Sequence, residues 1–504
     1  ADAAYGGQNT DGSKSMRNFY HIMRQMGAAA RHSLEQAAAI QWNSSLPMVG
    51  ARNHKVYHED GRELDFGRLA ELASRQPLPP LDSLKLKDSS EFRYIGKSLP
   101  VVDLRDLCTG GATYGVDVRI PGMLFASIER TPFLQGSVKS YDRAATLAQP
   151  GVVDVIHIEG TPLPSRFNAL EGVAVIARDS FSALAARARL NISWQGSAQQ
   201  SFQSEDFFTE LEHRVASGPG RIARSRGDAM AALDAATRTV EASYRAPFLA
   251  HAPMEPPVAT AHIHSGICEI WTSTQVPQST QRAVAQALGV EVDTVKVHVT
   301  LLGGGFGRKA QPDFAVEAAL LARVLERPVQ VAWTREDDIH NDYFHACSAQ
   351  YFKAGLNESG AITAWLAREA TPPISSISTA GANTRSDGDL SQTFASVPFA
   401  VPNLQIESHE ADAYTRIGWL RSVFNLPYAF GVGTFVDELA HAVGRNPLDF
   451  WLELIGEDRK LDFAPEGFKF SNHGKSLQDY PYDTGRFKDT IPVSYTHLRA
   501  HETV

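Results

Sequence analysis

The residues with the clearest chemical potential form a glycine-rich loop at positions 301–309, between a predicted strand and a predicted helix. The loop reads Leu-Leu-Gly-Gly-Gly-Phe-Gly-Arg-Lys, after alternating valines at 295–299 and before apolar residues at helical spacing from Phe314 to Leu325. Glycines let backbone N–H groups approach a ligand, and a helix that begins just beyond adds a partial positive charge. The loop therefore suits an anion such as phosphate. The alternative is a tight turn that only lets the strand and helix pack.

The loop matches neither of the common nucleotide-binding motifs. Arg308 occupies the position of the third glycine in a dinucleotide-binding fingerprint, and no Gly-Lys-Ser/Thr follows at the spacing of a Walker loop. After Pro328, alternation at 329–333 predicts a second strand. The order of strand, glycine loop, helix and strand indicates that the surrounding domain mixes helices with a sheet.

Three other stretches place polar side chains where ligands often bind. Gln275 lies between a predicted strand and a predicted helix, a usual position for ligand contacts in open α/β sheets, although a helix-capping amide is the alternative. His251 and Glu255 are flanked by prolines, so we expect a buried polar pair there, or a hydrogen-bonded core histidine. Arg421 stands among apolar residues, and a buried arginine needs an anionic or carbonyl partner.

Near the N-terminus, residues 5–15 form a loop rich in glycine and hydroxyl groups, before a predicted helix from Met16 to about Ile40. Hydroxyl and N–H groups in front of a helix suit phosphate or the amides of a pterin. The alternative is an ordinary N-cap and turn.

The composition is that of a soluble globular protein, with 43% hydrophobic and 21% charged residues. A length of 504 residues predicts two or three domains. A net charge of -9 without basic blocks argues against a nucleic-acid binder. Three cysteines without a Cys-x-x-Cys argue against a disulfide framework and against a cysteine-ligated zinc or iron–sulfur site within this chain. We expect each cysteine to be a small buried residue.

Taken together, several motifs resemble the xanthine oxidase family, and more closely the large molybdenum-binding subunit of isoquinoline 1-oxidoreductases and related aldehyde dehydrogenases. The motifs stand in the family's order and spacing: His251-Ala-Pro-Met-Glu-Pro256, Thr274-Gln275, Gly303-Gly-Gly-Phe-Gly-Arg308 and Trp419-Leu-Arg-Ser422. An early Gln-x-Thr-x-Gly-Ser-x-Ser-x-Arg segment of the same subtype is matched by Gln8, Thr10, Gly12, Ser13, Ser15 and Arg17. The resemblance covers about residues 5–458.

The resemblance implies a molybdopterin cofactor with molybdenum, in the cytosine dinucleotide form that is usual in bacteria. It implies that the catalytic residues are Gln275, which hydrogen-bonds an oxo ligand of the metal, and Arg421, which orients the substrate. The implied cofactor-binding residues are Gln8, Gly12, Ser13, Ser15, Gln275, Gly303, Gly304, Gly305, Phe306, Gly307 and Arg308. No protein side chain is implied as a metal ligand.

The implied reaction is hydroxylation of an electron-poor carbon, in an N-heteroaromatic ring or an aldehyde, with oxygen derived from water. The sequence does not decide between these substrates. Electrons would leave through a separate small [2Fe-2S] subunit to a cytochrome c or another acceptor. A bacterial cytoplasmic and a periplasmic location are both compatible with this interpretation.

One departure from the family leaves a second function open. The catalytic glutamate of the family belongs to a Gly-Val-Gly-Glu-like segment near the C-terminus, and residues 1–504 contain no such segment. The alternative is therefore a non-catalytic scaffold that binds the cofactor. A hydrolase built on His251 and Glu255 would lack a nucleophile motif.

We predict a mixed α+β fold, with a hammerhead-type module and a molybdopterin-binding domain of the aldehyde oxidase and xanthine dehydrogenase type. The predicted regions are a piece of the first molybdopterin-binding part (1–48), a small insert with a proline-rich linker (49–93), the hammerhead-like α+β module (94–196), a linker (197–236), an incomplete molybdopterin-binding domain (237–491) and a non-native tail (492–504). The tail resembles a translated sequencing adapter. We expect the chain to be a fragment cut at both ends, and inactive in isolation.

Overall fold

The structure is a computed structural model that describes residues 7–502. The chain divides into two compact units. The smaller unit is Asn9–Ala112, and the larger combines Ala1–Gln8 with Thr113–Val504. Both mix helices with strands, so the predicted mixed α+β class is confirmed.

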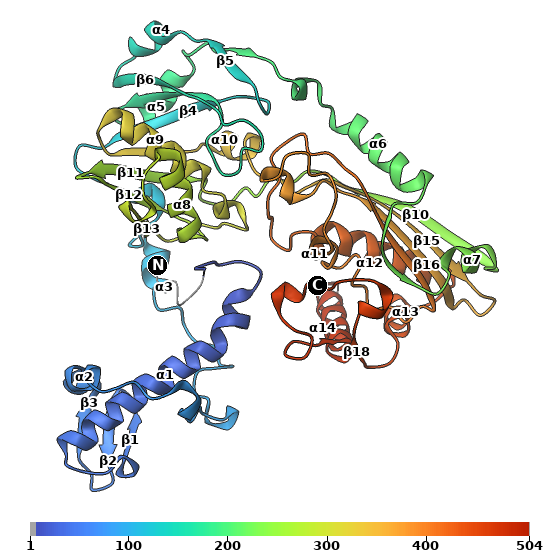
Figure 1. Ribbon diagram of the computed structural model, residues 1–504, viewed down its shortest axis with the longest axis horizontal. Coiled ribbons are helices and arrows are strands. Elements are labelled where there is room, and N and C mark those ends of the chain that lie inside the picture. The colour runs from blue at the N-terminus through green and yellow to red at the C-terminus, as the bar shows by residue number, and fades with distance from the viewer. Residues whose placement is uncertain (1–6, 503–504) are drawn as a thin grey trace. The chain divides into compact units, whose positions relative to one another are not determined.

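In the smaller unit, one long helix packs against a three-stranded antiparallel sheet (Figure 1). Ala37 and Ala38 of this helix are fully buried against Val56 of the sheet. Their small side chains let the helix approach the sheet closely. The predicted helix from Met16 to about Ile40 is confirmed. The elements are α1 (Lys14–Gln41), β1 (Val49–Arg52), β2 (Lys55–His58), β3 (Glu63–Asp65), α2 (Phe66–Ser74) and α3 (Leu104–Thr109).

A mixed seven-stranded sheet carries the glycine loop in the larger unit. Its strand order is β13-β12-β11-β14-β4-β7-β6, with parallel pairing between β12 and β13 and between β14 and β4. The strands are β4 (Leu124–Arg130), β6 (Val152–Ile158), β7 (Gly172–Ala177), β11 (Val258–His264), β12 (Ile267–Thr272), β13 (Val295–Val299) and β14 (Val329–Ala332). The helices along this part of the chain are α4 (Arg143–Leu147), α5 (Ser180–Arg187), α8 (Pro277–Leu288), α9 (Asp313–Leu325) and α10 (Arg335–His340). A short pair, β5 (Ser137–Ser140) and β8 (Ser193–Gln195), lies outside the sheet.

Apart from the short pair β5 and β8, the strands of the hammerhead-like region expected at 94–196 form no sheet of their own. Its strands β4, β6 and β7 continue the sheet of β11–β14, because Leu124–Ala126 pairs in parallel with Val329–Val331. The smaller unit also extends to Ala112 rather than ending at 93. Parallel pairing between strands about two hundred residues apart leaves no local pattern, so the spacing of residues could not reveal it. The other domain boundaries stay predictions.

A second sheet of five strands, in the order β10-β15-β16-β17-β9, packs against the largest apolar core. Phe352 and Trp365 of the sheet contact Phe435 of α12 through their rings. The strands are β9 (Arg221–Arg226), β10 (Arg238–Ala246), β15 (Ser348–Leu356), β16 (Ile362–Ala370) and β17 (Asn403–His409). The other elements of the larger unit are α6 (Ser204–Ser217), α7 (Ala229–Asp234), α11 (Asp387–Leu390), α12 (Asn425–Ala442), α13 (Pro447–Ile455), β18 (Lys460–Leu461), β19 (Tyr482–Asp483) and α14 (Thr484–Glu502).

The region expected to be a linker, 197–236, is instead regular structure: α6, β9 and α7. α6 buries one stripe of four apolar side chains, Phe207, Phe208, Leu211 and Val215. β9 forms an edge of the five-stranded sheet through its pairing with β17. The linker prediction was wrong because charged residues on the other faces of the helix make the segment polar on average, and the narrow apolar stripe was not recognised.

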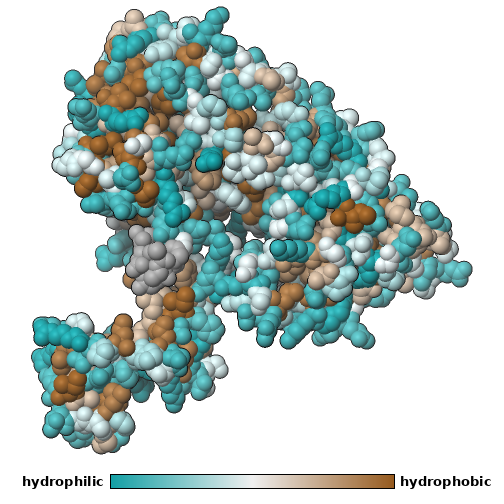
Figure 2. All heavy atoms as spheres, in the orientation of Figure 1, coloured by the Kyte–Doolittle hydropathy of each residue, from teal (hydrophilic) through white to brown (hydrophobic). Residues whose placement is uncertain are grey.

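At the C-terminus, the tail predicted at 492–504 continues α14 as far as Glu502, and residues 503–504 lie outside the described residues. The origin of the tail stays a prediction. No helix within residues 7–502 has the length and apolar character that crossing a membrane requires. Hydrophilic residues cover much of the face shown in Figure 2, and hydrophobic residues form separate patches between them. Cys268 and Cys347 are buried as expected, whereas Cys108 is exposed.

Candidate functional site

Glu255 holds the start and the end of the glycine loop together. Its backbone N–H donates to the Gly303 carbonyl at 2.8 Å, and its Oε2 accepts from the Gly303 N–H at 3.1 Å. The same oxygen accepts from Lys309 Nζ at 2.6 Å, while Oε1 accepts from the Gly115 N–H at 2.9 Å. Burial lowers the pKa of Lys309, and the Glu255 carboxylate opposes that effect. Three hydrogen bonds therefore join Glu255 to the loop, and a fourth joins it to Gly115.

Gln275 lies over the middle of the loop. It follows β12 and precedes α8, as predicted, and its backbone N–H donates to the Lys309 carbonyl at 3.0 Å. Its Oε1 accepts from the Gly307 N–H at 3.0 Å. A Cβ added to Gly305 would stand 2.5 Å from that Oε1. The N-cap residue of α8 is Val276, so Gln275 is not the helix cap that the sequence left open.

Three consecutive N–H groups of the loop point to an external acceptor. Within residues 7–502, the backbone N–H groups of Gly304, Gly305 and Phe306 donate to no protein acceptor. Gly305 is buried, and a buried N–H without a partner is rare in native proteins. Phe306 adopts φ 55°, unusual for a residue with a side chain, and its ring is 43% exposed. The loop thus offers a row of donors without protein partners, which fits a ligand rich in oxygen or nitrogen acceptors.

Gly307 touches the segment that carries Trp419. Its φ is 109°, and a Cβ there would stand 1.4 Å from the Trp419 carbonyl oxygen. His251 Nε2 lies 2.9 Å from the same oxygen, and His251 Nδ1 lies 2.9 Å from Asp342 Oδ2. Burial works against the charge of Asp342, but its bonds to His251 and the nearby Arg308 lower the pKa overall. The expected pairing of His251 with Glu255 was wrong: His251 pairs with Asp342, and Glu255 with Lys309.

Arg308 points into the interior, away from the row of free N–H groups. Its side chain is fully buried and bonds Asp313 at 2.9 Å and 3.2 Å, and its Nε lies 3.1 Å from Asp342. Burial opposes the positive charge, but these two carboxylates outweigh it and raise the pKa of Arg308. Because the side chain is buried, only the backbone of Arg308 could contact a ligand on the loop. Its predicted role in cofactor binding stays a prediction.

Arg421 is exposed, so the expectation of a buried arginine at this position was wrong. The buried arginine of this segment is Arg416, which donates to Asp313 Oδ2 at 2.9 Å and lies 4.1 Å above the Tyr343 ring. Ser422 and Val423 follow Arg421 with φ of 74° and 46°. A positive φ is a marked outlier for a β-branched residue, and such strain gathers at binding sites.

Replacing Arg421 by alanine should therefore change the free energy of unfolding by no more than about 0.5 kcal/mol, as for an ordinary surface substitution. Replacing Arg416 by alanine should cost several times more, because it leaves a buried Asp313 carboxylate with one partner fewer. Urea unfolding of both variants measures the difference. Equal losses in the two variants would show that Arg421 is packed rather than exposed.

Most of the site residues lie in a segment that matches a known domain family. Residues 208–453 match the family described as the molybdopterin cofactor-binding domain. This part of the chain is a molybdopterin cofactor-binding domain. The resemblance drawn from the motifs is thereby confirmed. Gln275, Gly303–Arg308 and Arg421 all lie inside the molybdopterin cofactor-binding domain.

Two curated relatives extend the match beyond the molybdopterin cofactor-binding domain. The chain is 27% identical to the beta chain of isoquinoline 1-oxidoreductase from Brevundimonas diminuta, over 89% of this chain and 62% of the relative. It is 25% identical to a subunit of the nicotinate dehydrogenase from Pseudomonas putida, over 90% of this chain and 39% of the relative. The chain thus spans 62% of the length of the first relative and 39% of the length of the second.

A solved structure shares the fold. The aldehyde oxidoreductase of Desulfovibrio gigas superposes with a TM-score of 0.58 at 19% sequence identity, over 76% of this chain and 45% of the other. At that identity the similarity shows the fold alone. The molybdopterin cofactor-binding domain therefore sits in a chain that shares the fold of this aldehyde oxidoreductase.

The remaining predicted cofactor contacts lie outside the molybdopterin cofactor-binding domain. Gln8 belongs to the larger unit, where its backbone N–H donates to Gln278 Oε1 at 3.0 Å. Gly12, Ser13 and Ser15 belong to the smaller unit, at the start of α1. Ser13 holds the N-cap position with φ 57°, but its side chain makes no capping bond. Their contact with a cofactor stays a prediction, and residues 5–6 of the same loop lie outside the described residues.

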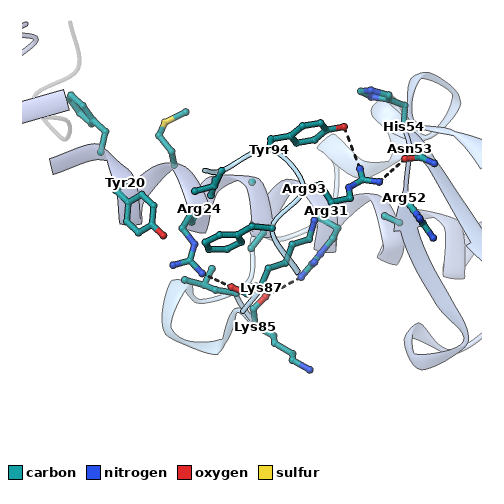
Figure 3. Close-up of a pocket in the computed structure, with 18 of the residues that line it drawn as sticks. Tyr20, Arg24, Arg31, Arg52, Asn53, His54, Lys85, Lys87, Arg93 and Tyr94 are labelled. Atoms are coloured by element: carbon teal, nitrogen blue, oxygen red, sulfur yellow. Dashed lines mark hydrogen bonds between the residues drawn. The ribbon is translucent and has the colours of Figure 1, made fainter. Parts of the chain in front are cut away.

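The smaller unit also has a cavity of about 630 Å³ between α1 and the 85–95 segment (Figure 3). Its arginines are engaged by the protein: Arg24 donates to the Lys87 carbonyl at 2.6 Å, and Arg31 to the Lys85 carbonyl at 3.0 Å. Arg93 donates to Asn53 Oδ1 at 2.7 Å. These bonds join the segment to the rest of the unit, so the arginines act first as structural links.

Sequence reasoning missed two residues that shape the site. Lys309 was treated only as part of the loop, yet it closes the ion pair with Glu255. Asp342, which bonds His251 and faces Arg308, lies ninety-one residues from the histidine. No local pattern marks either partner, because both contacts depend on how distant elements fold together.

Proposed function

We propose that this chain is the molybdenum-binding part of an oxidoreductase that hydroxylates an electron-poor carbon, and that its cofactor lies against Gly303–Gly307 and Gln275. The observation that carries the proposal is the row of N–H groups at Gly304–Phe306 that lack protein partners within residues 7–502. This row lies inside the matched domain, beneath the Gln275 amide. The cytosine dinucleotide form of the cofactor is part of the proposal.

The residues divide the work of holding such a group. The loop N–H groups would donate to its acceptor atoms, and the absence of side chains at Gly303–Gly305 would let it come close. Gln275 would present its amide from the opposite side, held in place by the Gly307 N–H. When bound, the molybdenum cofactor supplies the redox chemistry and the activation of water.

The proposed substrate is a flat, electron-poor molecule: an N-heteroaromatic ring or an aromatic aldehyde. Phe306 precedes Gly307, and the Trp419 carbonyl contacts Gly307; the two residues are 43% and 38% exposed, so their rings would be open to a ligand beside the loop. Phe167 lies 6.3 Å from Trp419 and extends this aromatic surface. Flat rings pack well against such side chains. Arg421 follows Trp419 and would orient a carboxylate or a developing negative charge on the substrate.

The proposed partner is a small [2Fe-2S] subunit, with a cytochrome c or another acceptor beyond it. The sequence has only three cysteines, and Cys268 and Cys347 are buried in separate core clusters. A cluster needs four ligands, mostly thiolates, so this chain cannot bind one with its own cysteines. We propose that electrons taken from the substrate leave through this partner.

Two variants test the site when the protein is expressed in a host that makes the cofactor. Gly305→Val should abolish molybdenum loading, because even a Cβ would stand 2.5 Å from Gln275 Oε1 and 2.9 Å from Leu302 Cδ2. Gln275→Ala should lower substrate oxidation about 10- to 100-fold, the usual cost of losing a residue that orients a metal centre. Elemental analysis gives the molybdenum content, and dye reduction gives the activity.

Gly50→Val is the matched control, since no atom lies within 4 Å of a Cβ added there. It should load molybdenum as the parent does. Normal loading and activity in both Gly305→Val and Gln275→Ala would remove the loop from the proposal. If the parent loads molybdenum but oxidises no aldehyde or N-heteroaromatic compound even with an iron–sulfur partner present, the non-catalytic scaffold is the better account.

A further inference from the structure

The outer face of strands β11–β13 carries three histidines and one glutamate close together. Successive side chains of a strand point to opposite faces, so His262 and His264 of β11 share a face. The register of the sheet sets His262 opposite Glu269 of β12, and Trp271 of β12 opposite His298 of β13. The three strands lie side by side in Figure 1.

Their ligand atoms are near enough to share one ion. One nitrogen of His262, one nitrogen of His264 and one carboxylate oxygen of Glu269 all lie within 4.8 Å of one another. His264 Nε2 lies 2.7 Å from Glu269 Oε2, and the two imidazole rings are 4.6 Å apart. Donors around a tetrahedral zinc ion stand about 3.3 Å apart, given bonds of about 2.0–2.1 Å. Small side-chain rotations would bring all three donors to that spacing.

His298 holds the glutamate in place from the other side. Its Nε2 lies 2.9 Å from Glu269 Oε1, and its ring stacks on Trp271 at 4.8 Å and 17°. A histidine that orients a ligating carboxylate in this way is a common feature of metal sites.

We propose that His262, His264 and Glu269 bind one divalent cation of the zinc type, with His298 as the residue that positions Glu269. Two imidazoles and one carboxylate are a donor set that zinc accepts, with water in the fourth position. The cation would join β11 to β12. It lies apart from the glycine loop, because Glu269 stands near the start of β12 whereas Gln275 follows its end.

One neighbouring charge works against the cation. Lys296 stands opposite Glu269 in the register, on the same exposed face, and within residues 7–502 it forms no ion pair. Its ammonium group would repel a bound cation. A variant without the Lys296 side chain should therefore bind the cation more tightly. A general loss of structure would weaken binding instead, so it could not produce this result.

The test is calorimetric titration of the metal-stripped 504-residue chain with zinc chloride. We expect one site that His264→Ala and Glu269→Gln weaken at least about 100-fold, and that His298→Ala weakens about 10- to 100-fold. Lys296→Ala should tighten it. His213→Ala, which removes an exposed histidine of α6, should leave the affinity unchanged. Zinc should raise the thermal midpoint of the parent but not of Glu269→Gln.

Zinc affinity that is the same in the parent, His264→Ala and Glu269→Gln would place any bound zinc elsewhere and overturn the proposal, as would a parent that binds no zinc. Because a variant can lose structure, zinc-edge X-ray absorption of the zinc-loaded parent gives an independent measurement. Two imidazole ligands and oxygen in the first coordination sphere support the site. Sulfur ligands, or oxygen alone, contradict it.

Discussion

Gly307→Ala is expected to destabilise the larger unit by at least about 4 kcal/mol, which is exceptional for a single methyl group. The added Cβ would stand 1.4 Å from the Trp419 carbonyl oxygen, inside covalent distance, so that segment must move. Moving it breaks the contact between this oxygen and His251 Nε2, and the φ of 109° adds strain that only glycine avoids. Urea unfolding followed by tryptophan fluorescence measures the loss.

Gly433→Ala provides the matched control. Gly433 lies within α12, and no atom is within 4 Å of a Cβ added there. Alanine in a helix interior gains about 1 kcal/mol over glycine, so this variant should be as stable as the parent or slightly more so. If Gly307→Ala unfolds at the same urea concentration as Gly433→Ala, the loop does not pack against Trp419 as described.

The local part of the site could be predicted from the sequence. Alternating valines gave the strand before the loop, helical spacing gave α9 after it, and the position of Gln275 followed from the strand and helix around it. Each of these features depends on residues that are neighbours in the chain. Periodicity and glycine content report such features directly, so the loop and the amide above it were found together.

The side chains beneath the loop could not be predicted, because their partners are distant. Arg416 is buried and Arg421 is exposed, although the apolar residues Ile417, Trp419 and Leu420 lie between them and are near both in the sequence. Asp342 follows α10 in the chain and lies ninety-one residues from His251, so only the folded chain brings the two together. Even the His-x-His spacing at 262–264 indicates little until strand pairing brings Glu269 and His298 beside it. Tertiary structure decides which charged side chains pair, and the pattern of a single sequence carries no information on tertiary contacts.

Arg308 is the centre of that buried network, and Arg308→Met is expected to cost about 3–5 kcal/mol of unfolding free energy. Methionine keeps much of the volume but leaves Asp342 without its arginine and Asp313 with only Arg416. The cost should shrink as the pH falls towards about 4, because Arg308 helps to lower the pKa of Asp342, and without that cation the Asp342 carboxylate takes up a proton more readily. Urea unfolding at about pH 7 and about pH 4.5 measures both effects.

Arg282→Met is the control for this change, since Arg282 is exposed on α8 and should tolerate methionine within about 0.5 kcal/mol. A double-mutant cycle with Asp342→Asn then separates the ion pair from simple packing. Arg308→Met and Asp342→Asn together should cost less than the sum of the two single changes, because the second removes the charge that the first leaves unpaired. Strict additivity would mean that Arg308 stabilises the loop through its contacts with Trp333 and Tyr343 instead.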